Sequence, residues 1–114
     1  MKKTIVIMFS VMLMLGIQNL YAESKSEKFK VAGNCGTCEK RIEKAALGVK
    51  GVSKADWNKD TKEMLVDFDA SKTSLDKVEA AIAKVGHDTP LYKADAKTYE
   101  SLPGCCKYDR PAVK

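Results

Sequence analysis

Residues 28–49, KFKVAGNCGTCEKRIEKAALGV, change their hydrophobic period part-way along. Polar and apolar residues alternate over residues 28–32, which predicts a half-buried strand. Residues 33–37 contain two glycines and predict a loop. Beyond this loop, apolar side chains recur at helical spacing, with charged residues on the other faces; they are Cys38, Ile42, Ala45 and Val49. The stretch therefore predicts a strand, a loop and a helix in succession.

The following residues repeat this order. Residues 52–57 are predicted to form a second strand, and the alternation of apolar and polar residues over 64–69 predicts a third. Residues 73–76, Thr-Ser-Leu-Asp, resemble a capping box that opens a second helix. The apolar stripe of that helix consists of Leu75, Val78, Ile82 and Val85.

A fourth strand is expected over residues 87–93, at a sheet edge because Pro90 lacks a backbone donor. Two strand–helix–strand units predict the α+β fold class, a ferredoxin-like βαββαβ sandwich with an antiparallel four-stranded sheet and two helices on one face. The predicted core consists of Phe29, Val31, Ile42, Val49, Val66, Phe68, Leu75, Val78, Ile82 and Val85.

The N-terminus resembles a secretory signal. Lys2 and Lys3 precede an apolar run over residues 5–17, and a polar break then leads to a cleavage site near Ala22. A membrane anchor would need about 20 apolar residues. We expect a signal peptide over residues 1–22 and a periplasmic or secreted mature protein.

Behind the signal, residues 23–94 are expected to form one domain. Glu23 to Ser26 are interpreted as a short polar leader to that domain. Residues 95–114 are expected to form a polar tail that carries Cys105 and Cys106, with a short helix before Pro103.

Composition excludes several functional classes. The 114 residues allow one small domain, and the net charge of +5 falls to +3 without the two lysines of the signal. The remaining basic residues are scattered, so no nucleic-acid partner is expected. One histidine and no phosphate-binding glycine loop leave little for a hydrolase or a nucleotide enzyme. We expect a soluble monomer that is not an enzyme.

Cys35 and Cys38 are separated by Gly-Thr and lie where the loop enters the first helix. A helix N-terminus favours the thiolate, which is the form that binds metal or attacks a disulfide. Two sulfurs at this spacing suit a soft ion of low coordination number, but they do not complete a four-ligand zinc site. A soft-metal site, a redox dithiol and a structural disulfide all remain open at this point.

These residues resemble the heavy-metal-associated domain family of copper chaperones, copper-ATPase domains and mercury-binding proteins. The resemblance covers residues 27–93 and rests on the first strand, the loop, the helix opening 38–45, and Gly51-Val52. Gly86-His87-Asp88 is similar to the Gly-Tyr-Asp of the family. The usual loop, Gly-Met-x-Cys-x-x-Cys, differs here because the Met is absent and the loop is one residue shorter.

The resemblance implies that Cys35 and Cys38 are metal ligands. It implies Cu(I) as the first candidate, with Hg(II), Zn(II) or Cd(II) as alternatives, for metal trafficking or sequestration. A metal-transporting ATPase or another membrane metal transporter is the implied partner. His87 falls beside the metal loop, either as a solvent-exposed turn residue or as a residue that supports the ligands or occasionally binds the ion as an additional ligand.

Two further interpretations stay open. The sequence Cys-Gly-Thr-Cys is also similar to a thioredoxin-type site, so a periplasmic thiol-disulfide oxidoreductase is the alternative function, although that fold needs parallel strands. Cys105 and Cys106 are either tail thiols that pair elsewhere or additional ligands at Cys35 and Cys38. The 12 residues from Lys93 to Cys105 can span about 40 Å, which permits the contact.

Overall fold

The computed structural model describes residues 23–110, so the expected signal peptide lies outside the described residues. The elements in chain order are β1 Ser24–Lys30, α2 Gly36–Leu47, β2 Val52–Trp57, β3 Glu63–Asp69, α3 Leu75–Lys84, α4 Ala96–Glu100 and the 3-10 turn η1 Gly104–Cys106. Within residues 23–110 no helix combines the length and apolar character needed to cross a bilayer.

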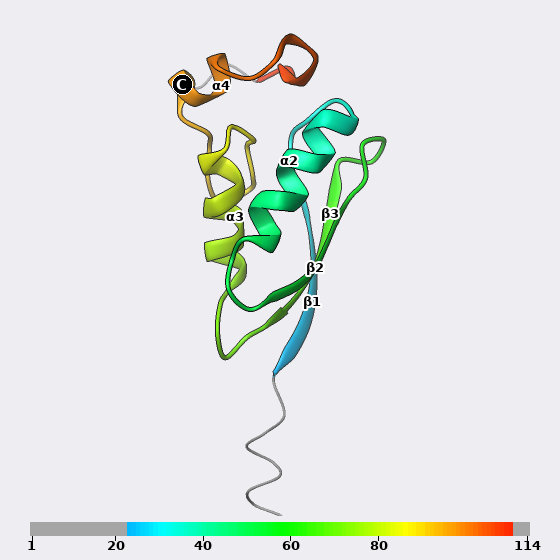
Figure 1. Cartoon of the computed structure of the whole chain (residues 1–114), viewed down its shortest axis with the longest axis vertical. Coiled ribbons are helices and arrows are strands. Elements are labelled where there is room, and N and C mark those ends of the chain that lie inside the picture. The colour runs from blue at the N-terminus through cyan, green and yellow to red at the C-terminus, as the bar shows by residue number, and fades with distance from the viewer. Residues whose placement is uncertain (1–22, 111–114) are drawn as a thin grey trace, which may run out of the picture.

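The three strands form one antiparallel sheet in the order β1-β3-β2. β3 is central, with Phe29 of β1 opposite Met64 and Ala55 of β2 opposite Val66. The helices α2 and α3 lie together on one face of this sheet (Figure 1). Alternate residues of β3 are buried toward the helices, as expected for a half-covered sheet.

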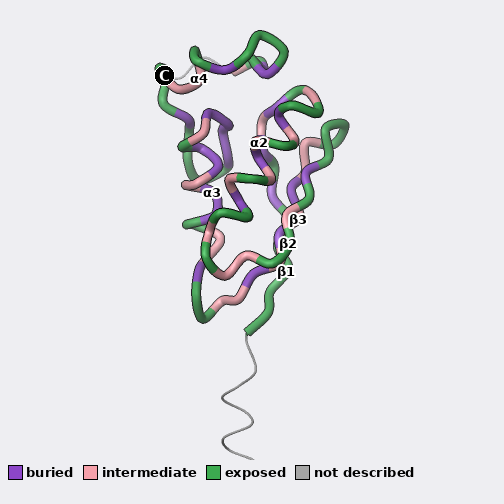
Figure 2. Tube along the Cα trace, viewed as in Figure 1, coloured by how far each residue is buried: buried purple, intermediate pink, exposed green. Residues whose placement is uncertain are grey.

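The core lies between the sheet and the two helices. Buried and exposed segments alternate along α2 and α3 (Figure 2), because each helix turns one apolar stripe inward. Seven residues of the predicted core are confirmed as buried: Phe29, Val31, Ile42, Val66, Phe68, Val78 and Ile82. Val49 and Leu75 are partly buried against them, and Val85 is intermediate.

Helix α3 is capped one residue later than the capping-box pattern suggests. The Oγ of Ser74 accepts a hydrogen bond from the backbone N–H of Lys77 at 3.4 Å. Thr73 is buried just before the helix. The hydroxyl at the N-cap satisfies one of the backbone donors that the first turn leaves free.

The expected polar leader is wrong, because β1 begins at Ser24. Ser24 pairs with Asp69, and the register continues without interruption to Lys30 opposite Glu63. The first residues of β1 are exposed and polar, because β1 is an edge strand. They therefore lack the alternation of apolar and polar residues that would have predicted a strand.

The fourth strand expected over residues 87–93 does not form, and the described sheet has three strands. Thr89 and Tyr92 close a turn instead, with the Thr89 N–H donating to the Tyr92 carbonyl at 2.8 Å. Pro90 lies inside this turn and has no N–H for a ladder. One strand-like contact remains, from the Ala32 N–H to the Asp88 carbonyl at 3.0 Å.

The C-terminal segment folds back over the end of the domain where α2 begins (Figure 1). The short helix expected before Pro103 is α4. Leu102 is buried against Gly86, whose φ is +112°. A Cβ at Gly86 would lie 2.9 Å from a Leu102 methyl carbon, so the segment packs directly on the turn after α3.

Candidate metal centre

Cys35 and Cys38 lie together at the start of α2. Cys35 is the N-cap residue, with an extended backbone, and its side chain is half-buried. Its Sγ is 3.7 Å from the Sγ of Cys38. Cys38 is fully buried in the core, and its Sγ accepts the backbone N–H of Asn34 at 3.4 Å. The site therefore has one accessible sulfur and one anchored sulfur.

The Trp57 ring packs against the loop that leads from Gly33 to Cys35. Its indole Nε1–H donates to the Val31 carbonyl at 3.1 Å, which fixes the ring. A Cβ on Gly33 would meet the ring at 2.9 Å, so only glycine lets the loop backbone pass this closely. Trp57 was absent from the predicted core, and no local pattern places it beneath a loop 24 residues away.

The Cys35 thiol is strongly acidic. Hydrogen bonding from the Cys38 backbone N–H is the largest cause, and the Thr37 N–H and the Cys105 side chain add to it, so the pKa falls to about 6. The first N–H groups of a helix have no partner within the helix and stabilise an anion at this position. Cys35 is therefore a thiolate at neutral pH, ready for a soft ion.

The tail brings two further sulfurs to this loop. Cys106 is fully buried, with its Sγ 3.9 Å from the Sγ of Cys35, and Cys105 is exposed. The sulfurs of Cys35, Cys105 and Cys106 lie within 4.8 Å of one another. Burial is the main cause that raises the pKa of Cys106 to about 12. All four cysteines, which lie within the described residues, are free thiols.

His87 is buried rather than exposed, so the expectation of a solvent-exposed turn residue is wrong. Its Nδ1–H donates to the Ala32 carbonyl at 2.8 Å, and its ring stacks on Tyr108 at 5.7 Å. Burial lowers the pKa of His87, so the imidazole is neutral. His87 does not belong to the thiol cluster found among the described residues. It instead ties the metal loop to the segment after α3.

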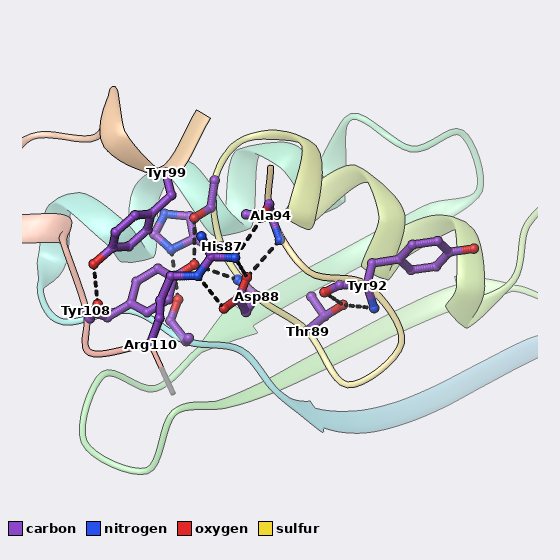
Figure 3. Close-up of polar contacts among 10 residues, drawn as sticks. His87, Asp88, Thr89, Tyr92, Ala94, Tyr99, Tyr108 and Arg110 are labelled. Atoms are coloured by element: carbon purple, nitrogen blue, oxygen red, sulfur yellow. Dashed lines mark hydrogen bonds and ion pairs between the residues drawn. The ribbon is translucent and has the colours of Figure 1, made fainter. Parts of the chain in front are cut away.

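Residues that position the tail were not identified from the sequence. The Tyr108 hydroxyl accepts the Asp88 N–H at 2.9 Å and donates to the Gly86 carbonyl at 2.8 Å. The Tyr99 hydroxyl donates to the Tyr108 carbonyl. Figure 3 shows these side chains converging on the loop after α3. The presence of Tyr99 and Tyr108 in an otherwise polar tail was the sequence feature that could have indicated these contacts.

Arg41 is one of the charged residues that flank the apolar stripe of α2. Its Nη1 is nevertheless buried, without a hydrogen-bond partner in the described part of the chain. The Arg41 side chain lies beside Cys106 and counteracts the burial that raises the pKa of this thiol.

The model of the heavy-metal-associated domain matches residues 28–88, more than half of the chain. The chain belongs to the heavy-metal-associated domain family. The match includes both cysteines of the loop and ends before the tail. The thioredoxin-like alternative requires parallel strands, and the described sheet is antiparallel.

Relatives in this family have two kinds of named cargo. A mercuric transport protein periplasmic component of Alcaligenes sp is 34% identical over 73 residues, covering 63% of this chain and 80% of the relative. The copper chaperone CopZ of Staphylococcus aureus is 33% identical over 55 residues, covering 48% and 81%. Oxidized MerP from Ralstonia metallidurans CH34 superposes with a TM-score of 0.56 at 34% identity, covering 58% and 93%. The fold is that of ferredoxin-like metallochaperones.

Proposed function

We propose that this heavy-metal-associated domain binds a soft metal ion through Cys35 and Cys38 for trafficking or sequestration outside the cytoplasm. The observation that carries the proposal is the pair of sulfurs 3.7 Å apart at the start of α2, one half-exposed and one buried. Cu(I) is the first candidate, and Hg(II) is the second because mercuric transport components are among the relatives.

Metal transfer would proceed by ligand exchange. The accessible Cys35 thiolate captures the ion first, and the buried Cys38 closes the site behind it. A partner thiolate then displaces Cys35 while Cys38 still holds the ion. No covalent bond of a substrate is made or broken, so the proposal does not require an enzyme. The domains of metal-transporting ATPases among the similar structures favour a membrane metal transporter as the partner.

Metal titration of the reduced protein tests the proposal. The chain is expressed from its first residue, and the N-terminus of the protein recovered from the periplasm is read by mass spectrometry, with cleavage expected near Ala22. Native mass spectrometry and chelator competition then follow binding of Cu(I), Hg(II), Zn(II) and Cd(II). We expect a 1:1 complex with Cu(I) and Hg(II).

The variant that tests the site is Cys35→Ser. Cys38 is less suitable, because it belongs to the core and its loss disturbs packing. The Cys35→Ser variant is expected to fold normally and to lose at least 100-fold in affinity for the soft ions. Stoichiometric binding that survives Cys35→Ser would contradict the proposal. Turnover of disulfide substrates without metal binding would instead favour the oxidoreductase.

A further inference from the structure

The tail is held against the metal loop by specific contacts, although it lies beyond the residues that match the family model. Tyr108 bridges Gly86 and Asp88 through its hydroxyl, and Leu102 packs on Gly86. These contacts lie on both sides of Cys105 and Cys106 in the chain. The position of the two tail thiols is therefore fixed by packing that does not involve the thiols themselves.

The two sulfur–sulfur distances measured from Cys35 suit a three-sulfur site better than a linear two-sulfur site. Cys35 Sγ lies 3.7 Å from Cys38 Sγ and 3.9 Å from Cys106 Sγ. Three thiolates at about 2.3 Å from a central ion lie about 4.0 Å apart, whereas two thiolates on opposite sides lie about 4.6 Å apart. A linear two-sulfur site would require Cys35 and Cys38 to separate by about 0.9 Å, whereas a three-sulfur site would keep both of these distances from the Cys35 sulfur almost unchanged.

Charge in the surroundings also favours a third thiolate. The Cys106 Sγ lies 3.9 Å from the Cys35 Sγ, and the side chain of Arg41 lies beside Cys106. Three thiolates around a monovalent ion carry two net negative charges, which are costly to bury alone. The buried Nη1 of Arg41, unpartnered among residues 23–110, places a compensating positive charge beside them.

We propose that Cys106 is a third thiolate ligand for the soft metal ion, an inference that rests on the proposed function at Cys35 and Cys38. As each metal–sulfur bond forms, the thiol protons of Cys38 and Cys106 pass to solvent, and no sulfur changes its oxidation state. Cys105 is exposed and is not assigned as a ligand, although its Sγ also lies within 4.8 Å of the Cys35 and Cys106 sulfurs. The third bond slows release, so the tail favours retention of the ion until a partner displaces it.

Cu(I) binding to the reduced full-length protein tests this assignment. X-ray absorption should show three sulfurs around copper in the wild type and two in Cys106→Ser. Competition with a Cu(I) chelator should show at least a tenfold loss of affinity in Cys106→Ser and a faster release. Cys105→Ser, which removes the neighbouring thiol of the same cluster, is the comparison that discriminates the two tail cysteines, and its loss of affinity should be clearly smaller than that of Cys106→Ser.

The outcomes separate the two proposals. A wild type that does not bind Cu(I) would remove the proposed function. Binding with two sulfurs, or equal affinity in the wild type and Cys106→Ser, would overturn the third ligand alone. An equal loss in Cys105→Ser would overturn the choice of Cys106. If Cys106→Ser unfolds without metal, the sulfur number in the wild type decides the question.

Discussion

The guanidinium of Arg110 holds the carboxylate of Asp88 through two hydrogen bonds of 3.0 Å each. Asp88 belongs to the loop after α3, and Arg110 lies near the C-terminal end of the described chain. The same guanidinium donates to the Ala94 carbonyl at 2.7 Å (Figure 3). The side chains are 16% and 8% exposed, so water weakens this pair little. One bidentate contact thus closes the tail into a loop that carries Cys105 and Cys106.

Arg110→Ala should loosen the tail. The variant leaves the Asp88 carboxylate nearly buried, with the Ala94 N–H as a remaining hydrogen-bond donor at 2.7 Å. Removing one partner of a buried pair costs about 3–5 kcal/mol, and this remaining donor together with partial exposure reduces the expected loss to about 1–3 kcal/mol. Urea denaturation of the metal-free protein measures the loss, and limited proteolysis should cut the tail faster.

Lys107→Ala provides the control for this pair. Lys107 meets Glu100 at 3.3 Å on the same tail, with side chains 38% and 70% exposed. Exposed pairs contribute little, so the free energy of unfolding should fall by less than about 0.5 kcal/mol. Equal losses in the two variants would show that the Arg110 pair does not hold the tail.

Alkylation of Cys35 should depend on pH in a distinctive way. Its pKa is lowered to about 6, so the thiolate fraction is nearly complete above pH 7 and falls about tenfold per pH unit well below pH 6. The iodoacetamide rate at Cys35, followed by peptide mapping in the metal-free protein, should therefore level off near neutrality. An ordinary cysteine, with a pKa of about 8.5, would still be gaining rate there.

The urea-unfolded protein is the reference for this measurement. Unfolding removes the helix N–H groups that stabilise the Cys35 thiolate, so the midpoint should rise toward the ordinary value. Because the folded pKa is the lower one, this group stabilises the fold at alkaline pH, and the contribution disappears as the pH falls through about 6. The same midpoint in folded and unfolded protein would contradict the role of the helix start.

Local patterns sufficed for most of the domain. Alternation at Met64, Val66 and Phe68 identifies β3, and the helical spacing from Cys38 to Val49 identifies α2, because a single buried face determines both periods. The spacing of Cys35 and Cys38 also marked the candidate site. All these signals come from residues that are near one another in the chain.

The remainder depends on contacts between distant residues. His87 resembles a surface turn residue until Tyr108, 21 positions later, stacks on it. The expected fourth strand does not form because Thr89 and Tyr92 make hydrogen bonds with each other instead of with a neighbouring strand. The length of the tail showed only that Cys106 could approach Cys35. The packing of Tyr108 and Leu102 on the turn after α3 accounts for the contact that the structure shows. No hydrophobic period encodes such contacts.

Ile82→Ala should test the core between α3 and the sheet. Ile82 is fully buried, so the variant leaves a cavity that costs about 2–5 kcal/mol in the free energy of unfolding. Urea denaturation of metal-free protein measures it. Leu47→Ala is the control, because Leu47 is 50% exposed and should lose less than about 1 kcal/mol. A smaller loss for Ile82 than for Leu47 would contradict the packing described.

Gly33→Ala should strain the metal loop against its support. The new Cβ would lie 2.9 Å from two carbons of the Trp57 ring, which is fixed by its bond to the Val31 carbonyl. Such overpacking costs about 1–3 kcal/mol. The chain contains one tryptophan, so its fluorescence reports the displacement directly. We expect a shifted emission maximum together with a lower midpoint of urea denaturation.

Gly36→Ala separates this steric effect from a general intolerance of the loop to side chains. Gly36 begins α2, three residues beyond Gly33, and nothing lies within 4 Å of a Cβ placed there. Alanine loses less backbone entropy than glycine in a helix, so this variant should be unchanged or gain up to about 1 kcal/mol. Its Trp57 emission should match the wild type. Equal urea midpoints and equal Trp57 emission in the two alanine variants would show that the contact between Gly33 and the indole does not shape the loop. The position of Cys35 would then depend on the start of the helix alone.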